Sequence, residues 1–315
     1  MKRAVIDVGT NSVKLLVAEV SGRLIVPLHE ASEQTRLGRG FYETHHLQAE
    51  AILKTAEAVA GFVAQARSFG AEQIRGVATS AAREASNALE LQRAILDQSG
   101  LALEIISGQQ EADWVFRGVA SDPRLAGRSL LILDVGGGST EFILGAGDAR
   151  HFQMSFPIGT VRLLEKFRPQ DPPGRDQLVV CRGWLESFIG REIAPALEGS
   201  LAQFRVAGAM LVGTGGTTTL LARMKHGAEN FNRDQIEATV LNRQEIIETT
   251  ERLWSMSLTA RQEIPGLAAN RADVILFGAE IYEAIMNRFG FEQLRISTRG
   301  LRYGALHDGL SGSGR

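Results

Sequence analysis

Apolar and polar residues follow one another along the chain in blocks that predict strands alternating with helices. Residues 47–70 carry apolar side chains at helical spacing, which predicts an amphipathic helix. Short apolar runs over 74–79 and 102–106 predict strands. Helices are expected over 86–99 and 109–120. Strands alternating with helices are typical of an α/β fold in which helices cover both faces of a sheet.

Two segments of the chain repeat one pattern, which is an apolar strand, a short polar turn and a second apolar strand. Residues 3–17 and 130–144 match when Asp7 is aligned with Asp134. The same alignment pairs Val8 with Val135, Gly9 with Gly136 and Ser12 with Ser139. Each segment predicts a β-hairpin whose glycine-containing tip can approach a ligand closely.

A second pair of similar segments supports an internal duplication. Residues 77–82 resemble residues 212–217, and in both cases an apolar strand leads into a helix-like segment. Two repeated pairs in the same order predict a duplicated domain. We expect the first domain over 1–124 and the second over 125–300, with the segment 301–315 a candidate to pack on the first.

Composition excludes several classes of protein. The net charge of −2 gives no overall basic surface for nucleic acid, and no run of about 18 apolar residues is present to span a membrane. The single cysteine, Cys181, follows an apolar run and is expected to be a buried thiol. One cysteine allows no intramolecular disulfide, which fits a reducing compartment. We therefore expect a cytoplasmic protein with neither nucleic acid nor membrane as a partner.

The two hairpin tips have the chemistry of phosphate-binding loops. Backbone N–H groups that converge at a turn form a concave site for an anion, and glycine lets the backbone approach a phosphate closely. The residues expected to bind phosphate are Thr10, Asn11 and Ser12 at the first tip and Gly136, Gly137, Gly138 and Ser139 at the second.

Carboxylates border both tips. Asp7 and Asp134 end the apolar strands that lead into the turns, and Glu141 lies two residues after Ser139 on the same face of its strand. Mg²⁺ binds carboxylate oxygens directly or through water, and in phosphate chemistry it bridges the oxygens nearest the breaking bond. The sequence therefore predicts Mg²⁺, or another divalent cation, near Asp7, Asp134 and Glu141.

Six motifs together identify a family. They are DVGTNS (7–12), ATSAAREA (78–85), ISGQQEA (106–112), LDVGGGSTE (133–141), GTGGT (213–217) and GLRYG (300–304). In this order they resemble the exopolyphosphatase / guanosine pentaphosphate phosphohydrolase family over essentially the whole chain. The resemblance implies duplicated ribonuclease-H-like domains of the actin-like ATPase superfamily, with the active site in the cleft between them. Longer relatives have an additional C-terminal helical domain, which we do not expect here.

The resemblance also implies roles for single residues. Glu111 matches the general base that activates water, and Arg83 matches a phosphate-binding arginine. Asp134 and Glu141 match acidic groups near the metal. Residues 136–139 match a phosphate loop, and in the motif 213–217 the residues assigned to phosphate binding are Gly215 and Gly216.

Three further positions have no single interpretation. Tyr303 stands where the family usually has glutamate, so we assign it no role. Arg36 and Arg39 are candidates for contacts with distal phosphates and, equally, for solvated loop residues.

The function expected is hydrolysis of the terminal phosphoanhydride bond of inorganic polyphosphate. The alternative within the family is 5′-hydrolysis of guanosine pentaphosphate. A sugar or acetate kinase of the same fold and a non-catalytic nucleotide or alarmone sensor are more distant alternatives. Because no Lys- or Arg-rich extension is evident, we expect long polyphosphate to be held loosely and shortened through intermediate lengths. A homodimer is an open possibility.

Overall fold

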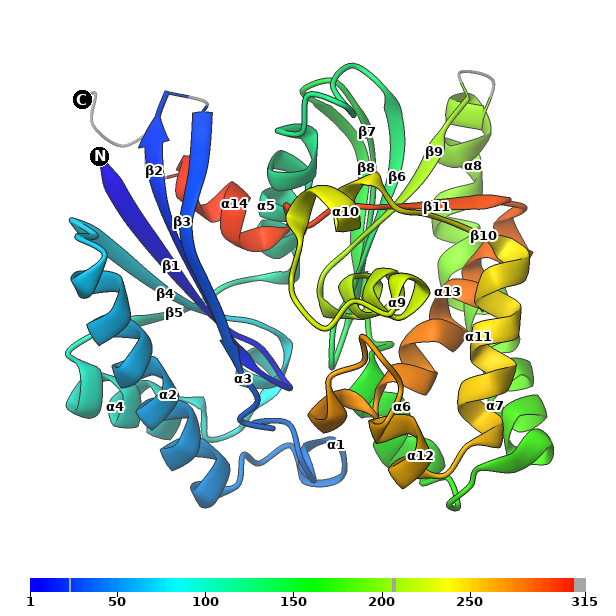
Figure 1. Ribbon diagram of the computed structural model, residues 1–315, viewed down its shortest axis with the longest axis horizontal. Helices are drawn as coiled ribbons and strands as arrows, with labels where there is room; N and C mark the ends of the chain where they lie inside the picture. The colour runs from blue at the N-terminus through cyan, green and yellow to red at the C-terminus, as the bar shows by residue number, and fades with distance from the viewer. Residues whose placement is uncertain (23, 206–207, 309–315) are drawn as a thin grey trace. The chain divides into compact units, whose positions relative to one another are not determined.

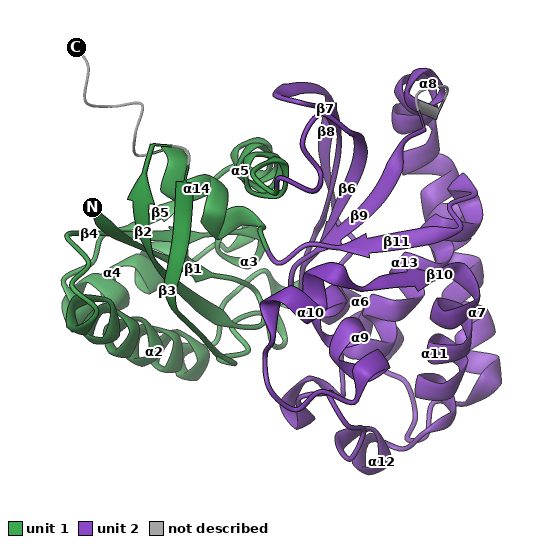
Figure 2. Cartoon of the chain, turned by 45° about the horizontal axis from the view of Figure 1, so that its top comes forward, with its two compact units in different colours: residues 1–122, 299–315 green, residues 123–298 purple. Residues whose placement is uncertain are grey.

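The chain folds into two compact units. The computed structural model describes residues 1–22, 24–205 and 208–308 (Figure 1). Unit 1 comprises Met1–Asp122 together with the segment that begins at Arg299, and unit 2 comprises Pro123–Thr298 (Figure 2). No helix in the described part of the chain is long and apolar enough to cross a membrane.

Unit 1 is built on a five-stranded sheet with the order β3-β2-β1-β4-β5. The strands β1, β2 and β3 form an antiparallel meander, and β4 and β5 extend it in parallel from β1. The central strands β1 and β2 bury side chains on both faces, which requires helices on both sides. The strands are β1 (Lys2–Val8), β2 (Val13–Ser21), β3 (Leu24–Glu33), β4 (Gln73–Ala78) and β5 (Leu103–Ile105).

Helices cover both faces of this sheet. The view in Figure 2 has α2 and α4 on one face and α5 and α14 on the other. The last helix packs closely on α5, since a Cβ at Gly304 would lie 1.9 Å from the Trp114 carbonyl oxygen. The helices are α1 (Phe41–Thr44), α2 (Ala49–Ser68), α3 (Ser80–Glu84), α4 (Ala88–Ser99), α5 (Gly108–Ala120) and α14 (Leu301–Asp308). Of the segment 301–315, residues 309–315 lie outside the described residues.

Unit 2 is built on a six-stranded sheet with the order β10-β11-β9-β6-β7-β8. Again three strands form an antiparallel meander and two more extend it in parallel, with β10 added as an antiparallel edge strand. The strands are β6 (Ser129–Val135), β7 (Thr140–Ala146), β8 (Ala149–Phe156), β9 (Met210–Thr214), β10 (Val240–Asn242) and β11 (Gln293–Ile296).

The core of unit 2 surrounds α13, most of whose side chains are buried. Cys181 lies in this core as a free, buried thiol, as the sequence predicts. The helices are α6 (Thr160–Phe167), α7 (Gly174–Phe188), a π-helical turn (Ile189–Ile193), α8 (Ala194–Arg205), α9 (Gly216–His226), α10 (Arg233–Ala238), α11 (Arg243–Ser255), α12 (Leu258–Gln262), a 3-10 turn (Ala269–Arg271) and α13 (Ile275–Phe289).

The two units share one topology. Read from the meander, β3-β2-β1-β4-β5 of unit 1 corresponds to β8-β7-β6-β9-β11 of unit 2, with matching parallel and antiparallel pairs. The prediction of an α/β fold made of duplicated ribonuclease-H-like domains is therefore confirmed. The predicted helices over 47–70, 86–99 and 109–120 correspond to α2, α4 and α5.

Candidate active site

The two predicted hairpins form and close with the same turn. In unit 1 the Gly9 N–H donates to the Ser12 carbonyl at 3.0 Å, and in unit 2 the Gly136 N–H donates to the Ser139 carbonyl at 2.9 Å. Each tip is therefore four residues long, 9–12 in unit 1 and 136–139 in unit 2. The internal repeat seen in the sequence is a repeat of backbone geometry.

The tip of unit 2 is held by the start of α6. Backbone N–H groups of the first turn of α6 donate to the carbonyls of Gly136 and Gly137 at 2.8 to 3.1 Å. The Arg162 Nε donates to the Gly138 carbonyl at 2.8 Å. In a trans peptide the C=O and the following N–H point in opposite directions. The N–H groups that follow these three carbonyls therefore point away from α6, as phosphate binding requires.

This contact depends on the absence of a side chain at Gly159. A Cβ there would lie 2.5 Å from the carbonyl carbon and oxygen of Gly137 and 2.6 Å from the carbonyl carbon of Gly138. Such distances are far below van der Waals contact, and the atoms concerned are backbone that cannot move aside without changing the tip. Gly159 thus permits α6 to touch the loop that it holds.

An acidic pair lies at the base of the same tip. Asp134 and Glu141 are directly opposite each other in the β6–β7 pair. The buried Glu141 accepts hydrogen bonds on Oε1 from the hydroxyls of Ser139 and Ser155, both at 2.8 Å. A Cβ on Gly215, whose φ is 91°, would lie 2.4 Å from the Asp134 Oδ1. The structure therefore brings Asp134, Glu141, Ser139 and Gly215 together, and Gly216 begins α9 beside them.

The tip of unit 1 is buried and is held in a comparable way. Thr10, Asn11 and Ser12 are each at most 8% exposed. The Gly38 N–H donates to the Thr10 carbonyl at 2.7 Å, and the Arg36 N–H donates to the Asn11 carbonyl at 3.0 Å. Here too the carbonyls are engaged, so the N–H groups that follow them point the other way. The loop segment that contains Arg36 and Gly38 thus holds the unit 1 tip through its backbone, as α6 holds the unit 2 tip.

Asp7 is the carboxylate beside the unit 1 tip. Burial raises the pKa of Asp7, against the opposing positive charges of Lys14 and Arg302. Its Oδ1 is buried and has no hydrogen-bond partner among the described residues. A buried, unpartnered carboxylate oxygen is costly, and a bound cation would offset that cost. Asp7 is thus chemically suited to hold a divalent cation.

The three predicted metal ligands are divided between the two units. No group of three or more His, Cys, Asp or Glu residues is arranged to hold a metal within the parts of the chain that the structure describes. Asp7 belongs to unit 1, and Asp134 and Glu141 belong to unit 2. Mg²⁺ is commonly held by one or two carboxylates plus water and phosphate oxygens, so either location fits a site completed by substrate.

The two predicted catalytic residues contact each other directly. Arg83, in α3, donates from Nη1 to the Glu111 Oε2 at 3.0 Å and to the Ile106 carbonyl at 3.0 Å. Glu111 lies in the first turn of α5, where the Ser107 side chain caps the helix by accepting from the Gln110 N–H. The motif 106–112 thus fixes the start of α5 and places the nearly buried Glu111 carboxylate against a guanidinium.

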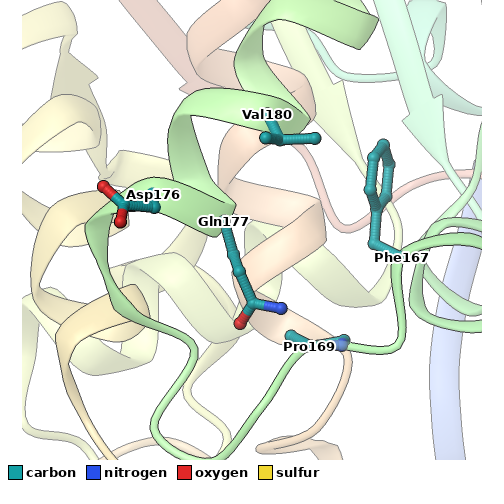
Figure 3. A pocket seen from close by; sticks show the side chains of 5 residues that line it. All are labelled: Phe167, Pro169, Asp176, Gln177 and Val180. Atoms are coloured by element: carbon teal, nitrogen blue, oxygen red, sulfur yellow. The ribbon is translucent and has the colours of Figure 1, made fainter.

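A surface pocket of unit 2 includes none of the predicted site residues. It has a volume of about 250 Å³ and is lined by Phe167, Pro169, Asp176, Gln177 and Val180 (Figure 3). Phe167 ends α6, whereas the glycine tip contacts the opposite end of that helix. The pocket is therefore separate from the unit 2 tip, residues 136–139.

These loops, pairs and strand orders can be compared with known proteins. A family model described as the Ppx/GppA phosphatase family matches residues 16–312. The chain belongs to this family. Exopolyphosphatase 2 of Mycobacterium tuberculosis is 32% identical over 307 residues, which cover 93% of this chain and 94% of that protein.

Solved structures agree with the assignment to the Ppx/GppA family. An exopolyphosphatase from Cytophaga hutchinsonii superposes with a TM-score of 0.88 at 26% identity, covering 99% of this chain and 98% of that one. The Aquifex aeolicus member of the Ppx/GppA family superposes with a TM-score of 0.79 at 28% identity, covering 100% and 99%. The chain is thus similar to phosphatases over its full described length.

In this Ppx/GppA chain, several residues near the tips were not predicted from the sequence. Lys14 lies opposite Asp7 in the β1–β2 pair, and the repeat alignment could have revealed it because Lys14 occupies the position of Glu141. Gly159 and Arg162 lie in no recognised motif, so no sequence signal identifies them. Of the positions left open, Arg36 is half-buried with a φ of 54°, Arg39 is exposed, and Tyr303 is buried in α14.

Proposed function

We propose that this chain is an exopolyphosphatase that hydrolyses the terminal phosphoanhydride bond of inorganic polyphosphate and releases orthophosphate. The observation that carries the proposal is the ion pair of Arg83 and Glu111, which joins a phosphate-binding group to a candidate base. The two glycine-containing tips add N–H donors for further phosphate oxygens. The similarity to M. tuberculosis exopolyphosphatase 2 supports the choice of polyphosphate.

In the proposed reaction, Glu111 orients a water molecule and accepts its proton as the water attacks the terminal phosphorus. Arg83 orients Glu111 in the free protein and binds an oxygen of the terminal phosphate when substrate is present. The N–H groups at 9–12 of unit 1 bind phosphate oxygens and help to fix the chain for in-line attack, and the tip 136–139 of unit 2 is a second candidate for phosphate binding. The departing phosphate is a weak base, so the reaction needs no strong general acid.

A divalent cation, Mg²⁺ in the first instance, fits this proposal. Asp134 and Glu141 would hold it in unit 2, and Asp7 is the candidate ligand in unit 1. When bound, such a cation offsets negative charge on the phosphate oxygens. The hydrogen bonds that Glu141 accepts from Ser139 and Ser155 keep that carboxylate in place beside the tip.

Phosphate release by the purified chain tests the proposal. Polyphosphates of defined length and guanosine pentaphosphate are compared with MgCl₂ and with excess chelator. We expect release from polyphosphate with Mg²⁺, and none from the Glu111→Gln variant measured in parallel. Release from guanosine pentaphosphate alone would transfer the assignment to the alternative substrate. Phosphoryl transfer from ATP to a sugar or to acetate, or binding without any turnover, would overturn it.

A further inference from the structure

The segment that follows β3 is fitted closely to the unit 1 tip. Beyond the two backbone hydrogen bonds to Thr10 and Asn11, a Cβ at Gly38 would lie 2.3 Å from the Thr10 Cγ2. Arg36 adopts a left-handed backbone conformation, with a φ of 54°, at the point where its N–H meets Asn11. Such a conformation is uncommon outside glycine and persists where surrounding contacts require it.

One side chain of this segment, Gln34, also contacts the Asn11 amide of the tip. The Gln34 Nε2 donates to the Asn11 Oδ1 at 3.1 Å. The Asn11 Nδ2 is buried and has no hydrogen-bond partner among the described residues. Asn11 as a whole is 8% exposed. A buried amide nitrogen without an acceptor is unfavourable in the free protein, and an anion at the tip would satisfy it.

The direction of this hydrogen bond decides what the tip offers to a ligand. A side-chain amide has an acceptor oxygen and a donor nitrogen that exchange places when the group turns over. Because Gln34 engages the oxygen of the Asn11 amide, the NH₂ group is the part of this amide that remains to bind a ligand. Turned over, it would present a carbonyl oxygen, which repels a phosphate oxygen. Gln34 could also accept a hydrogen bond, but the structure has it donating.

We propose that Gln34 is a positioning residue that sets the orientation of the Asn11 amide so that its NH₂ group binds a phosphate oxygen. This inference rests on the proposed binding of a phosphate chain at the tip 9–12. Gln34 acts through Asn11 and need not touch the substrate itself. It therefore affects the affinity for phosphate and not the chemical step.

Two substitutions of Gln34 separate orientation from simple loss of contact. Gln34→Ala removes the constraint and leaves Asn11 free to turn in either direction. Gln34→Glu has nearly the same shape but only accepts hydrogen bonds, so it favours the turned amide, whose oxygen faces the phosphate. We expect a hydrogen bond to a charged group to be worth roughly tenfold or more in affinity. The order of affinity should be wild type, then Gln34→Ala, then Gln34→Glu.

The probe is inorganic tripolyphosphate, and binding is measured by isothermal titration calorimetry on the full chain carrying Glu111→Gln to suppress turnover. A double-mutant cycle with Asn11→Ala removes the effect of the extra charge in Gln34→Glu. We expect Gln34→Glu to weaken binding about tenfold or more with Asn11 present and less than about threefold in the Asn11→Ala background. Unchanged melting temperatures confirm that the variants fold.

The outcomes separate this inference from the proposed function. Equal losses of affinity in the Asn11 and Asn11→Ala backgrounds, or no loss in either Gln34 variant, would overturn the positioning role while phosphate release by the wild type still supports the function. A coupled loss of affinity in a chain that hydrolyses no substrate would uphold the role of Gln34 and overturn the exopolyphosphatase assignment. Absence of any tripolyphosphate binding would overturn both.

Discussion

The Arg83 Nη1 lies 3.0 Å from the Glu111 Oε2, so the two residues form an ion pair within unit 1. The same nitrogen is held by the Ile106 carbonyl, which leaves the guanidinium little freedom. A carboxylate fixed in this way is oriented before any substrate binds. Because a general base acts in the transition state, removal of the proposed base Glu111 is expected to slow turnover more than it weakens substrate binding.

Glu111→Gln is expected to lower kcat by about 10²–10⁴ while KM changes little, since an amide of the same shape cannot accept the proton of water. Steady-state phosphate release from polyphosphate measures both constants. Glu90→Gln, an exposed change on α4 of the same unit, is the matched control and should leave kcat unchanged. A Glu111→Gln variant with nearly wild-type kcat would exclude Glu111 as the base.

Asp134→Asn is expected to raise the Mg²⁺ concentration needed for half-maximal activity. The substitution keeps the size of the side chain but removes the charge that attracts a hard cation. Activity is titrated against MgCl₂ for the variant and for Asp148→Asn, which changes an exposed carboxylate between β7 and β8. Full wild-type activity in excess chelator, or identical Mg²⁺ titrations for both variants, would contradict the proposed metal site.

Gly159→Ala is expected to disturb the unit 2 tip. Its Cβ would meet the backbone of Gly137 at 2.5 Å, and overpacking of this kind costs about 1–3 kcal/mol. We expect a melting temperature lower by several degrees and a loss in kcat/KM of about tenfold or more, because the N–H groups of the tip lose their alignment.

The control for this prediction is Gly183→Ala in α7. A Cβ at Gly183 meets nothing within 4 Å, so alanine should stabilise the helix by about 0.5–1 kcal/mol without affecting turnover. Thermal unfolding followed by circular dichroism and kinetic assays on both variants test the pair. Equal behaviour of the two alanine variants would mean that the contact between α6 and the tip has no role in activity.

The sequence predicts local features well and contacts across the chain poorly. The hairpins that contain Asp7 and Asp134 follow from strand patterns and glycine-containing turns within about 15 residues. The support that Gly159 and α6 give to the 136–139 tip, and that Gln34 gives to Asn11, depends on segments brought together by folding. No periodicity or motif marks these residues, because their role is set by backbone approach and hydrogen-bond direction.

The core of unit 2 contains a carboxylate that the candidate site does not use. Glu280, on α13, is fully buried, and neither of its carboxylate oxygens has a hydrogen-bond partner among the described residues. Its nearest cation is Arg182 of α7, whose Nε lies 3.8 Å away and which also pairs with Glu283 at 2.8 Å and with Glu251 of α11 at 3.7 Å. Glu283 and Cys181 are further titratable groups close to Glu280.

Glu280 is therefore expected to make the free energy of unfolding depend on pH. Burial, followed by the negative charge of Glu283, raises the pKa of Glu280 to about 8, against the attraction of Arg182. Between its ordinary pKa and about 8 the folded chain keeps a proton that the unfolded chain releases, so stability falls as pH rises through this range. Each unit of pKa difference corresponds to about 1.4 kcal/mol, and the total loss should reach a few kcal/mol.

Glu280→Gln mimics the protonated acid, so it should be close to wild type at pH 5 and more stable at pH 9. Urea unfolding at both pH values measures the difference, with the exposed Glu248→Gln of α11 as the control. Parallel pH dependences for wild type and Glu280→Gln would show that Glu280 does not titrate in this way.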